Sequence, residues 1–158
     1  MVDSKRVGPP KNEWRTPPQF LEAVERYFDI KFTLDPCAAP DNHLKIPEFF
    51  TAKDNGLSWP WEGVVWVNPP FETKWLWVRQ AYLESLDRGA DVWVLLENCT
   101  DSLDFHSWAP LCEVYLLRGR IAFLGPGLRS FGSGFRGYML LHFRRGVEPV
   151  IRAVDLTR

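Results

Sequence analysis

Cysteine is scarce in this sequence, and the three cysteines present, Cys37, Cys99 and Cys112, are far apart. A disulfide framework needs cysteines in pairs, and a zinc site needs ligands at short, regular spacings. The three histidines are equally scattered: His43, His106 and His142. We expect structural or surface roles for them. The sequence therefore predicts neither disulfides nor a metal site, and it favours a reducing, cytoplasmic location.

Long apolar runs are also missing. No stretch approaches the roughly 18 apolar residues that a membrane-spanning helix needs. The first residues, MVDSKRVGPPKNEW, contain charges and prolines where a secretory signal has its apolar core. A chain of 158 residues with 46% hydrophobic residues is long enough for one buried core. We expect residues 1–13 to form a flexible lead and residues 14–158 to form a single domain.

Lysine is absent from residues 110–158, which contain eight arginines and three acidic residues. The first 109 residues contain 11 basic and 17 acidic side chains, so the overall net charge of −1 conceals a basic final third. Arginine binds phosphates and base edges through paired hydrogen bonds. The pattern favours contact with nucleic acid, and the plainer alternative is a set of solvated arginines at strand ends.

Apolar runs and turn residues predict an α/β fold. The expected strands cover residues 31–36, 64–67, 91–97, 112–117 and 137–143. The expected helices start at Thr16 as the N-cap with Pro17 as first helical residue, at Lys74 and at Asp104. Residues 38–63 read as mostly irregular. Strands alternating with helices indicate a mostly parallel sheet with helices on both faces, and the last two strands should pair antiparallel.

The segment VVWVNPPF (64–71) indicates chemistry on an amine. Asn68 follows a buried strand directly, at the edge where ligands of parallel sheets bind. Pro69 and Pro70 have restricted φ angles and no N–H groups, so the carbonyl groups around them are held rigidly. Together with the Asn68 side-chain carbonyl they form acceptors for the hydrogens of an amine on a flat ring, and Phe71 can stack on that ring.

Several motifs in the same order resemble the phage-type Dam DNA adenine methyltransferases. The motifs are WRTPPQFL (14–21), TLDPCAA (33–39), DNGL (54–57), VVWVNPPF (64–71) and GRIAF (119–123). The resemblance covers residues 14–143 and implies a Rossmann-like methyltransferase fold. It also implies methyl transfer from S-adenosylmethionine to the 6-amino group of adenine in DNA, with the base flipped out of the duplex. A chain of this length leaves no room for a separate target-recognition domain.

The resemblance assigns roles to individual residues. Asn68, Pro69, Pro70 and Phe71 would be catalytic. The cofactor would be bound by Thr16, Pro17, Asp35, Pro36, Ala38 and Asp54. DNA would be contacted by Arg120, Phe123, Arg129 and Arg136, within the arginine-rich segment 118–136. Asp41 is the acidic residue closest to the position expected for a ribose ligand.

Other functions remain open at this stage. Protein glutamine methyltransferases also use an Asn-Pro-Pro motif, and methylation of a cytosine amine is a related reaction. The glycines usual after Asp-Pro are replaced here by Cys37-Ala38-Ala39, which keeps open a non-catalytic nucleic-acid-binding relative. Pro36-Cys37 resembles the nucleophile of enzymes that methylate a cytosine carbon, but it follows the first strand, where such a nucleophile is not expected.

Overall fold

The computed structural model describes residues 14–128 and 136–158, so the predicted lead over residues 1–13 lies outside it. Within these ranges, seven strands form one sheet in the order β2-β1-β3-β4-β6-β5-β7. The strands are β1 (Leu34–Asp35), β2 (Glu48–Phe49), β3 (Val64–Val67), β4 (Asp91–Glu97), β5 (Glu113–Leu117), β6 (Tyr138–Phe143) and β7 (Val150–Val154). β2, β1, β3 and β4 run parallel, whereas β6 is antiparallel to both β4 and β5.

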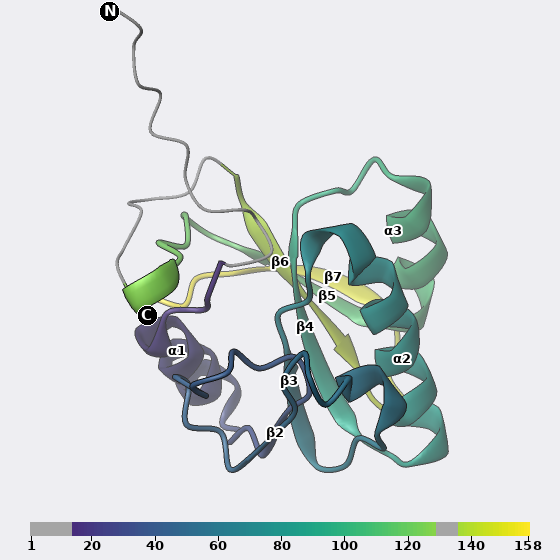
Figure 1. Cartoon of the computed structure of the whole chain (residues 1–158). Helices are drawn as coiled ribbons and strands as arrows, with labels where there is room; N and C mark the ends of the chain where they lie inside the picture. Colours follow the sequence, from purple (N-terminus) through teal and green to yellow (C-terminus); the bar gives the residue numbers. More distant parts are fainter. Residues whose placement is uncertain (1–13, 129–135) are drawn as a thin grey trace, which may run out of the picture.

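Helices cover both faces of this sheet (Figure 1). α1 (Pro18–Phe28) lies on one face, and α2 (Lys74–Asp87) and α3 (Leu103–Trp108) lie on the other. Short 3-10 turns occur at η2 (Gly56–Ser58), η3 (Phe71–Thr73), η4 (Ala109–Leu111) and η5 (Pro126–Leu128). No helix in the described ranges has both the length and the apolar character to cross a bilayer. This mostly parallel sheet between helices confirms the predicted α/β fold class.

The apolar runs of the central strands reflect the two helical layers. In β3, Val65 and Val67 pack with Val78 of α2 in the core on one face. Trp66 lies between them in sequence and packs with Val24 of α1 in the core on the other face. Successive side chains of a strand point to opposite faces, so a strand covered on both sides has to be apolar throughout.

Helix α1 begins differently from the prediction. Pro17 is the N-cap and Pro18 the first helical residue, and no side chain caps this end. The prediction that Thr16 caps the helix is wrong, because its hydroxyl accepts a hydrogen bond from Asn68, 52 residues away in the sequence. A Thr-Pro-Pro sequence is a good local helix start, but here the tertiary partner takes the hydroxyl.

The C-terminal half of the sheet confirms one expectation and adds a strand. β5 and β6 pair antiparallel, as predicted for residues 112–117 and 137–143. β7 was not predicted, and it pairs in parallel with β5 at the edge of the sheet. Most of its residues are exposed, so no apolar run marks it in the sequence. β2 was also missed, because it consists of only two exposed residues.

The parallel strands place three polar side chains along one edge of the sheet. Asp35 is the last residue of β1, Asn68 directly follows β3, and Glu97 is the last residue of β4. Because parallel neighbours end at the same edge, these side chains lie at the carboxyl edge, where ligands of open α/β sheets bind. This edge is the place to look for a functional site.

Candidate active site

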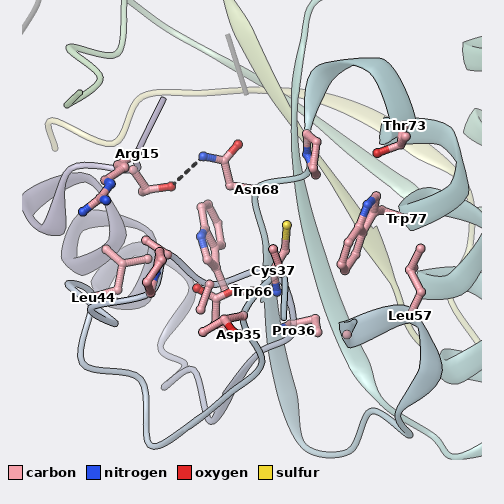
Figure 2. Close-up of a pocket in the computed structure, with 18 of the residues that line it drawn as sticks. Arg15, Asp35, Pro36, Cys37, Leu44, Leu57, Trp66, Asn68, Thr73 and Trp77 are labelled. Carbon is pink, nitrogen blue, oxygen red and sulfur yellow. Dashed lines mark hydrogen bonds between the residues drawn. The ribbon is translucent and has the colours of Figure 1, made fainter. Parts of the chain in front are cut away.

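A cavity of about 460 Å³ opens at the carboxyl edge of β1 and β3. Its volume falls in the range typical of small-molecule sites. In Figure 2, Asn68 lies at one end of the cavity and Asp35 at the other, and the ring of Trp66 stands between them. The flanking side chains include Arg15, Leu44, Leu57 and Trp77.

The side-chain amide of Asn68 is held in one orientation. Its Nδ2 donates to the Thr16 hydroxyl at 3.2 Å and to the backbone carbonyl oxygen of Trp14 at 3.3 Å. The dashed line in Figure 2 marks a hydrogen bond from this nitrogen. An amide has two N–H hydrogens, so these bonds engage both and turn Oδ1 away from Trp14 and Thr16. The side-chain carbonyl of Asn68 is thereby directed as an acceptor.

The prolines after Asn68 differ in their backbone contacts. Pro70 lines the large cavity, and its carbonyl oxygen accepts a hydrogen bond of 3.2 Å from the backbone N–H of Thr73. This bond belongs to the turn η3, which carries Phe71. The Pro70 carbonyl is therefore engaged within the turn, and the role of the Pro69 carbonyl towards a substrate amine stays a prediction.

Residues 14–16 are fixed from two sides. Arg15 forms an isolated antiparallel bridge with Leu124, with N–O distances of 2.7 and 3.0 Å. The backbone carbonyl of Thr16 accepts a hydrogen bond of 2.8 Å from Nε2 of His43. Thr16 itself is only 1% exposed. The segment therefore forms a rigid support for the Asn68 amide.

Asp35 supplies a buried carboxyl group at the other end of the cavity. One of its oxygens accepts a hydrogen bond of 3.0 Å from the backbone N–H of Cys37. Burial raises the pKa of Asp35 to about 7, although the Cys37 N–H acts in the opposite direction. A carboxylate without a cation beside it is disfavoured in such a place. The cavity is thus suited to a ligand that brings a positive charge to Asp35.

Cys37 lines the same cavity, but its thiol is not activated. Burial, and then the negative charge of Asp35, raise the pKa of this thiol well above its usual range. A nucleophilic cysteine needs a lowered pKa. Its surroundings therefore argue against a covalent role for Cys37.

The turn η2 closes the cavity next to Pro36. A Cβ atom on Gly56 would lie only 1.8 Å from the carbonyl oxygen of Pro36. The Gly56 carbonyl accepts a hydrogen bond of 2.9 Å from the buried indole N–H of Trp61. Glycine is therefore required where η2 packs directly on the Asp35–Pro36 turn.

A second, smaller cavity of about 40 Å³ shares Asn68 and Trp14 with the first. Phe71 and Phe123 line it, together with Glu97. The Phe123 ring lies 5.6 Å from the Trp14 ring, measured between centroids. Asn68 therefore stands between a large cavity and a small one with aromatic walls.

Phe71 lies at the surface and is 36% exposed. The ammonium group of Lys74 lies 4.3 Å from the centre of its ring, a cation–π contact. Lys74 was not singled out in the sequence, because the arginines of the final third dominated the charge pattern. It adds a positive charge beside the Asn-Pro-Pro-Phe turn.

The predicted DNA-contacting arginines have different surroundings. Arg136 donates a hydrogen bond of 3.1 Å to the buried carboxylate of Glu97, which also accepts one of 3.3 Å from the Tyr138 hydroxyl. Arg120 is exposed, with a guanidinium nitrogen 3.2 Å from the position of a Cβ on Gly137. Arg129 lies outside the described residues. Arg120 and Arg136 therefore both lie near the smaller cavity, since Glu97 and Tyr138 line it.

The structure brings most of the predicted cofactor residues together, but not all. Thr16, Asp35, Pro36 and Ala38 line the large cavity. Pro17 is buried as the N-cap of α1 and does not line it.

Asp54 also lies outside the cavity wall. Its exposed carboxylate accepts hydrogen bonds from the backbone N–H and hydroxyl of Thr51, at 2.8 and 2.9 Å. The residues that follow it, Asn55, Gly56 and Leu57, line the cavity in its place. A contact between Asp54 and a cofactor stays a prediction.

His43 is a cavity residue that the sequence analysis did not identify. A single histidine in an irregular segment carries no local signal for such a role. Within residues 14–128 and 136–158, no three His, Cys, Asp or Glu side chains are grouped as metal ligands.

Comparison with known proteins identifies the family. The model of the family described as DNA N-6-adenine-methyltransferase (Dam) matches residues 3–155. A DNA N-6-adenine-methyltransferase of Haemophilus phage HP1 is 33% identical over 131 residues, which are 78% of this chain and 73% of the phage protein.

A crystal structure of a predicted O-methyltransferase from Agrobacterium tumefaciens is 17% identical, with a TM-score of 0.36. The match covers 89% of this chain and 64% of that one, and a similarity this weak carries no argument. The family match over nearly the whole chain is decisive by contrast, and the phage relative agrees with it. The chain belongs to the Dam family of DNA N-6-adenine-methyltransferases.

Proposed function

We propose that this protein transfers a methyl group from S-adenosylmethionine to the 6-amino group of adenine in DNA. Family membership supports the reaction. One structural observation supports the placement of the chemistry: Asn68 lies in the wall of both cavities, between the residues proposed to bind the methyl donor and those proposed to bind the base. A group that orients an amine towards a donor has to stand at that boundary.

The large cavity fits the methyl donor. S-adenosylmethionine, when bound, supplies a methyl group on a positively charged sulfur, which is reactive enough for a weakly nucleophilic aromatic amine. Its amino-acid end carries an ammonium group, and the buried carboxyl of Asp35 suits such a cation. Pro36 and Ala38 would line the same end of the site. Binding of the cation would favour the ionised form of Asp35, which burial alone disfavours.

Asn68 and Pro69 would orient the target amine. The side-chain carbonyl of Asn68 is directed as an acceptor because Thr16 and Trp14 engage its amide hydrogens. Two acceptors that hold the two amine hydrogens turn the nitrogen lone pair towards the methyl group, which is catalysis by positioning and electrostatics. Both acceptors are neutral carbonyl groups, so the proton that the methylated amine has to lose would pass to solvent and not to either of them.

The small cavity would receive the adenine. Its volume of about 40 Å³ has room for only one or two water molecules, so side chains at its mouth have to move when a base enters. Phe71 is suited to this movement because it is partly exposed, and it can then stack on the base. Phe123 would form the opposite, buried wall. A base inside a duplex cannot reach this site, so the base would flip out.

Positive side chains around the small cavity would contact the DNA backbone. Arg120 and Arg136 are the predicted contacts described in the structure, and Arg136 keeps an exposed side chain (63%) despite its bond to Glu97. Charged contacts to phosphates make binding strongly dependent on salt. The phage origin of the relative supports the proposal that the reaction takes place in the cytoplasm of a bacterial host cell.

Transfer of labelled methyl from S-adenosylmethionine to unmethylated DNA tests the proposal. The DNA is then digested to nucleosides to identify the modified base. Label should appear in N6-methyladenine and disappear with Asn68→Ala, while cofactor binding measured by calorimetry is retained. Gln80→Ala removes an amide on α2 that bonds Glu84, and it should behave like the wild type.

Each alternative function gives a different result in this experiment. Label in methylcytosine would assign a cytosine amine as the target. Label in protein but not in DNA would favour a glutamine methyltransferase. A chain that binds DNA but not the methyl donor would be a non-catalytic relative, and the proposed reaction would be wrong.

A further inference from the structure

Lys74 lies beside the turn that carries the predicted catalytic residues. Its ammonium nitrogen is 4.3 Å from the centre of the Phe71 ring and 5.5 Å from the centre of the Trp75 ring. Both distances are short enough for cation–π contacts, and the lysine side chain is partly buried. The positive charge is therefore held close to the Asn-Pro-Pro-Phe turn.

The charge of Lys74 also acts on the segment that follows β4. Burial raises the pKa of the Cys99 thiol, whereas the Ser102 hydroxyl and the positive charge of Lys74 act in the opposite direction. Cys99 lies two residues after Glu97, the last residue of β4. Because Glu97 and Phe71 both line the small cavity, the ammonium group lies near the place proposed for the base.

Neither the helix nor an ion pair explains a lysine at this position. Lys74 is the first residue of α2, the N-cap Thr73 makes no side-chain cap bond, and the first turn contains no acidic residue. A positive charge is unfavourable at this end of a helix. Among the described residues, no carboxylate forms an ion pair with Lys74. An anion supplied by the substrate would therefore bind favourably here.

We propose that Lys74 binds a phosphate group next to the flipped adenine. A base and its two flanking phosphates are joined through one sugar, so a base stacked on Phe71 brings a phosphate close to Lys74. When Phe71 moves onto the base, the ammonium loses its contact with the ring and gains the phosphate. A charge-assisted hydrogen bond to a phosphate is stronger than a cation–π contact. This inference rests on the proposed function, the methylation of a flipped adenine in DNA.

Three substitutions separate the charge of Lys74 from its packing. Lys74→Met keeps an unbranched side chain against the two rings and removes the charge. Lys74→Arg keeps a cation that can bind phosphate. Arg26→Met is the matched control, because Arg26 is an exposed cation in the last turn of α1, at the opposite end of that helix from Thr16.

The test uses a short duplex around an adenine that the wild type methylates. One of the two phosphates that flank this adenine is replaced by a neutral methylphosphonate. In wild type and Arg26→Met, one of the two replacements should lower kcat/KM for DNA about 10-fold, the value expected for one charged hydrogen bond. Lys74→Met should lose a similar factor with the unmodified duplex and show no further loss with that replacement. Lys74→Arg should recover most of the activity and the sensitivity to the replacement.

The salt dependence of kcat/KM gives a second readout. Cations bound to phosphates release counterions from DNA, so each such contact steepens the dependence of binding on salt. The slope of log kcat/KM against log salt concentration should be smaller in magnitude by about 1 in Lys74→Met than in wild type. Phe71→Ala removes the ring without changing the charge, and it should keep the wild-type slope. Equal slopes for Lys74→Met and wild type would contradict the phosphate contact.

Two further results would overturn the proposal while the proposed function stands. In the first, neither methylphosphonate lowers kcat/KM of the wild type, a result that applies even where a variant does not fold. In the second, the replacement lowers kcat/KM of Lys74→Met and of wild type by the same factor, which would limit Lys74 to supporting Phe71. A wild-type chain that transfers no methyl group to DNA would instead overturn the proposed function, and the phosphate contact with it.

Discussion

The amide nitrogen of Asn68 lies 3.2 Å from the hydroxyl oxygen of Thr16, and this contact joins the Asn-Pro-Pro-Phe turn to the segment before α1. The backbone carbonyl of Thr16 is bonded separately to His43, so the two polar groups of Thr16 serve different partners. The orientation of the Asn68 amide therefore depends on a residue distant in sequence.

Thr16→Val keeps the shape of the side chain and removes the hydroxyl. We expect kcat for methyl transfer to fall about 5–10-fold, the effect of one lost hydrogen bond on the positioning of Asn68. Steady-state kinetics with varied S-adenosylmethionine would measure this, and KM for the donor should change less than kcat.

Thr33→Val is the matched control for Thr16→Val. The Thr33 hydroxyl donates to the backbone carbonyl of Val64 and accepts from its N–H, and Thr33 does not line the cavity. The Thr33→Val substitution should leave kcat for methyl transfer unchanged. Equal effects of the two substitutions on kcat would contradict a specific role for Thr16.

Asp35 gives the free energy of unfolding a defined pH dependence. The folded-state pKa of about 7 is raised by burial from the ordinary value of 3.8, so between these values the folded chain holds a proton that the unfolded chain has released. Stability without ligand should therefore fall as pH rises through this window and level off above it. Asp35→Asn removes this dependence.

Urea unfolding at two pH values checks the sign. From about pH 5 to about pH 8, Asp35→Asn should gain roughly 2–3 kcal/mol in the free energy of unfolding relative to wild type. Asp54→Asn is the control for this window, because the N–H and hydroxyl of Thr51 lower the pKa of the exposed Asp54 below its ordinary value of 3.8. Asp54 is then ionised in both the folded and the unfolded chain from about pH 5 to about pH 8, so the difference between Asp54→Asn and wild type should stay constant over this range. A constant difference between Asp35→Asn and wild type at both pH values would show that Asp35 is ionised without penalty.

Gly56→Ala should destabilise the protein by about 2 kcal/mol or more and weaken cofactor binding. The added methyl group would lie 1.8 Å from the Pro36 carbonyl oxygen, so η2 has to move away from the cavity. Thermal unfolding and calorimetry would record the two effects.

Gly119→Ala serves as the comparison for backbone strain. Gly119 has φ of +83°, but a Cβ there would meet no atom within 4 Å. Its loss of stability should be limited to about 1 kcal/mol, the strain of a left-handed residue. If Gly56→Ala were no worse than Gly119→Ala, the close packing of η2 on Pro36 would not be needed.

Phe71→Ala should reduce kcat/KM for DNA about 10–100-fold, since stacking of one base on an aromatic ring contributes about 1–3 kcal/mol. Binding of the methyl donor should be unaffected, because Phe71 lines only the small cavity. Phe49→Ala removes another exposed aromatic ring, on the edge strand β2, and should leave kcat/KM near that of wild type. A loss of donor affinity in Phe71→Ala would contradict the separation of the two cavities.

The sequence predicted the strands whose burial is visible in their composition. β3 and β4 are apolar on both faces because helices cover both sides of the sheet. β7 could not be found in this way, because Ile151, Arg152 and Ala153 are exposed and only pairing with β5 makes the segment a strand. A strand that forms only because it pairs with a neighbouring strand cannot be recognised from the hydrophobic pattern of its own residues.

The candidate site was predictable where chemistry is concentrated in consecutive residues. The predicted site residues at strand ends are Asp35 and the segment 68–71. The end of a buried strand can be predicted from sequence, because an apolar run stops there. Thr16 was misread as a helix cap because a hydroxyl before two prolines has a good local explanation. His43 was missed because its two contacts, with Thr16 and with the cavity, form only in the folded chain.

Trp14 and Asn68 belong to the walls of both cavities, so the two proposed ligand sites are adjacent compartments. An adenine can be joined by a short linker to an analogue of the methyl donor. Such a molecule would extend past Asn68 and occupy both compartments at once. Linking the two parts raises the effective concentration of the second once the first has bound. If the two cavities bind the methyl donor and the base as proposed, a bisubstrate inhibitor should bind most tightly when its linker length matches the span at Asn68.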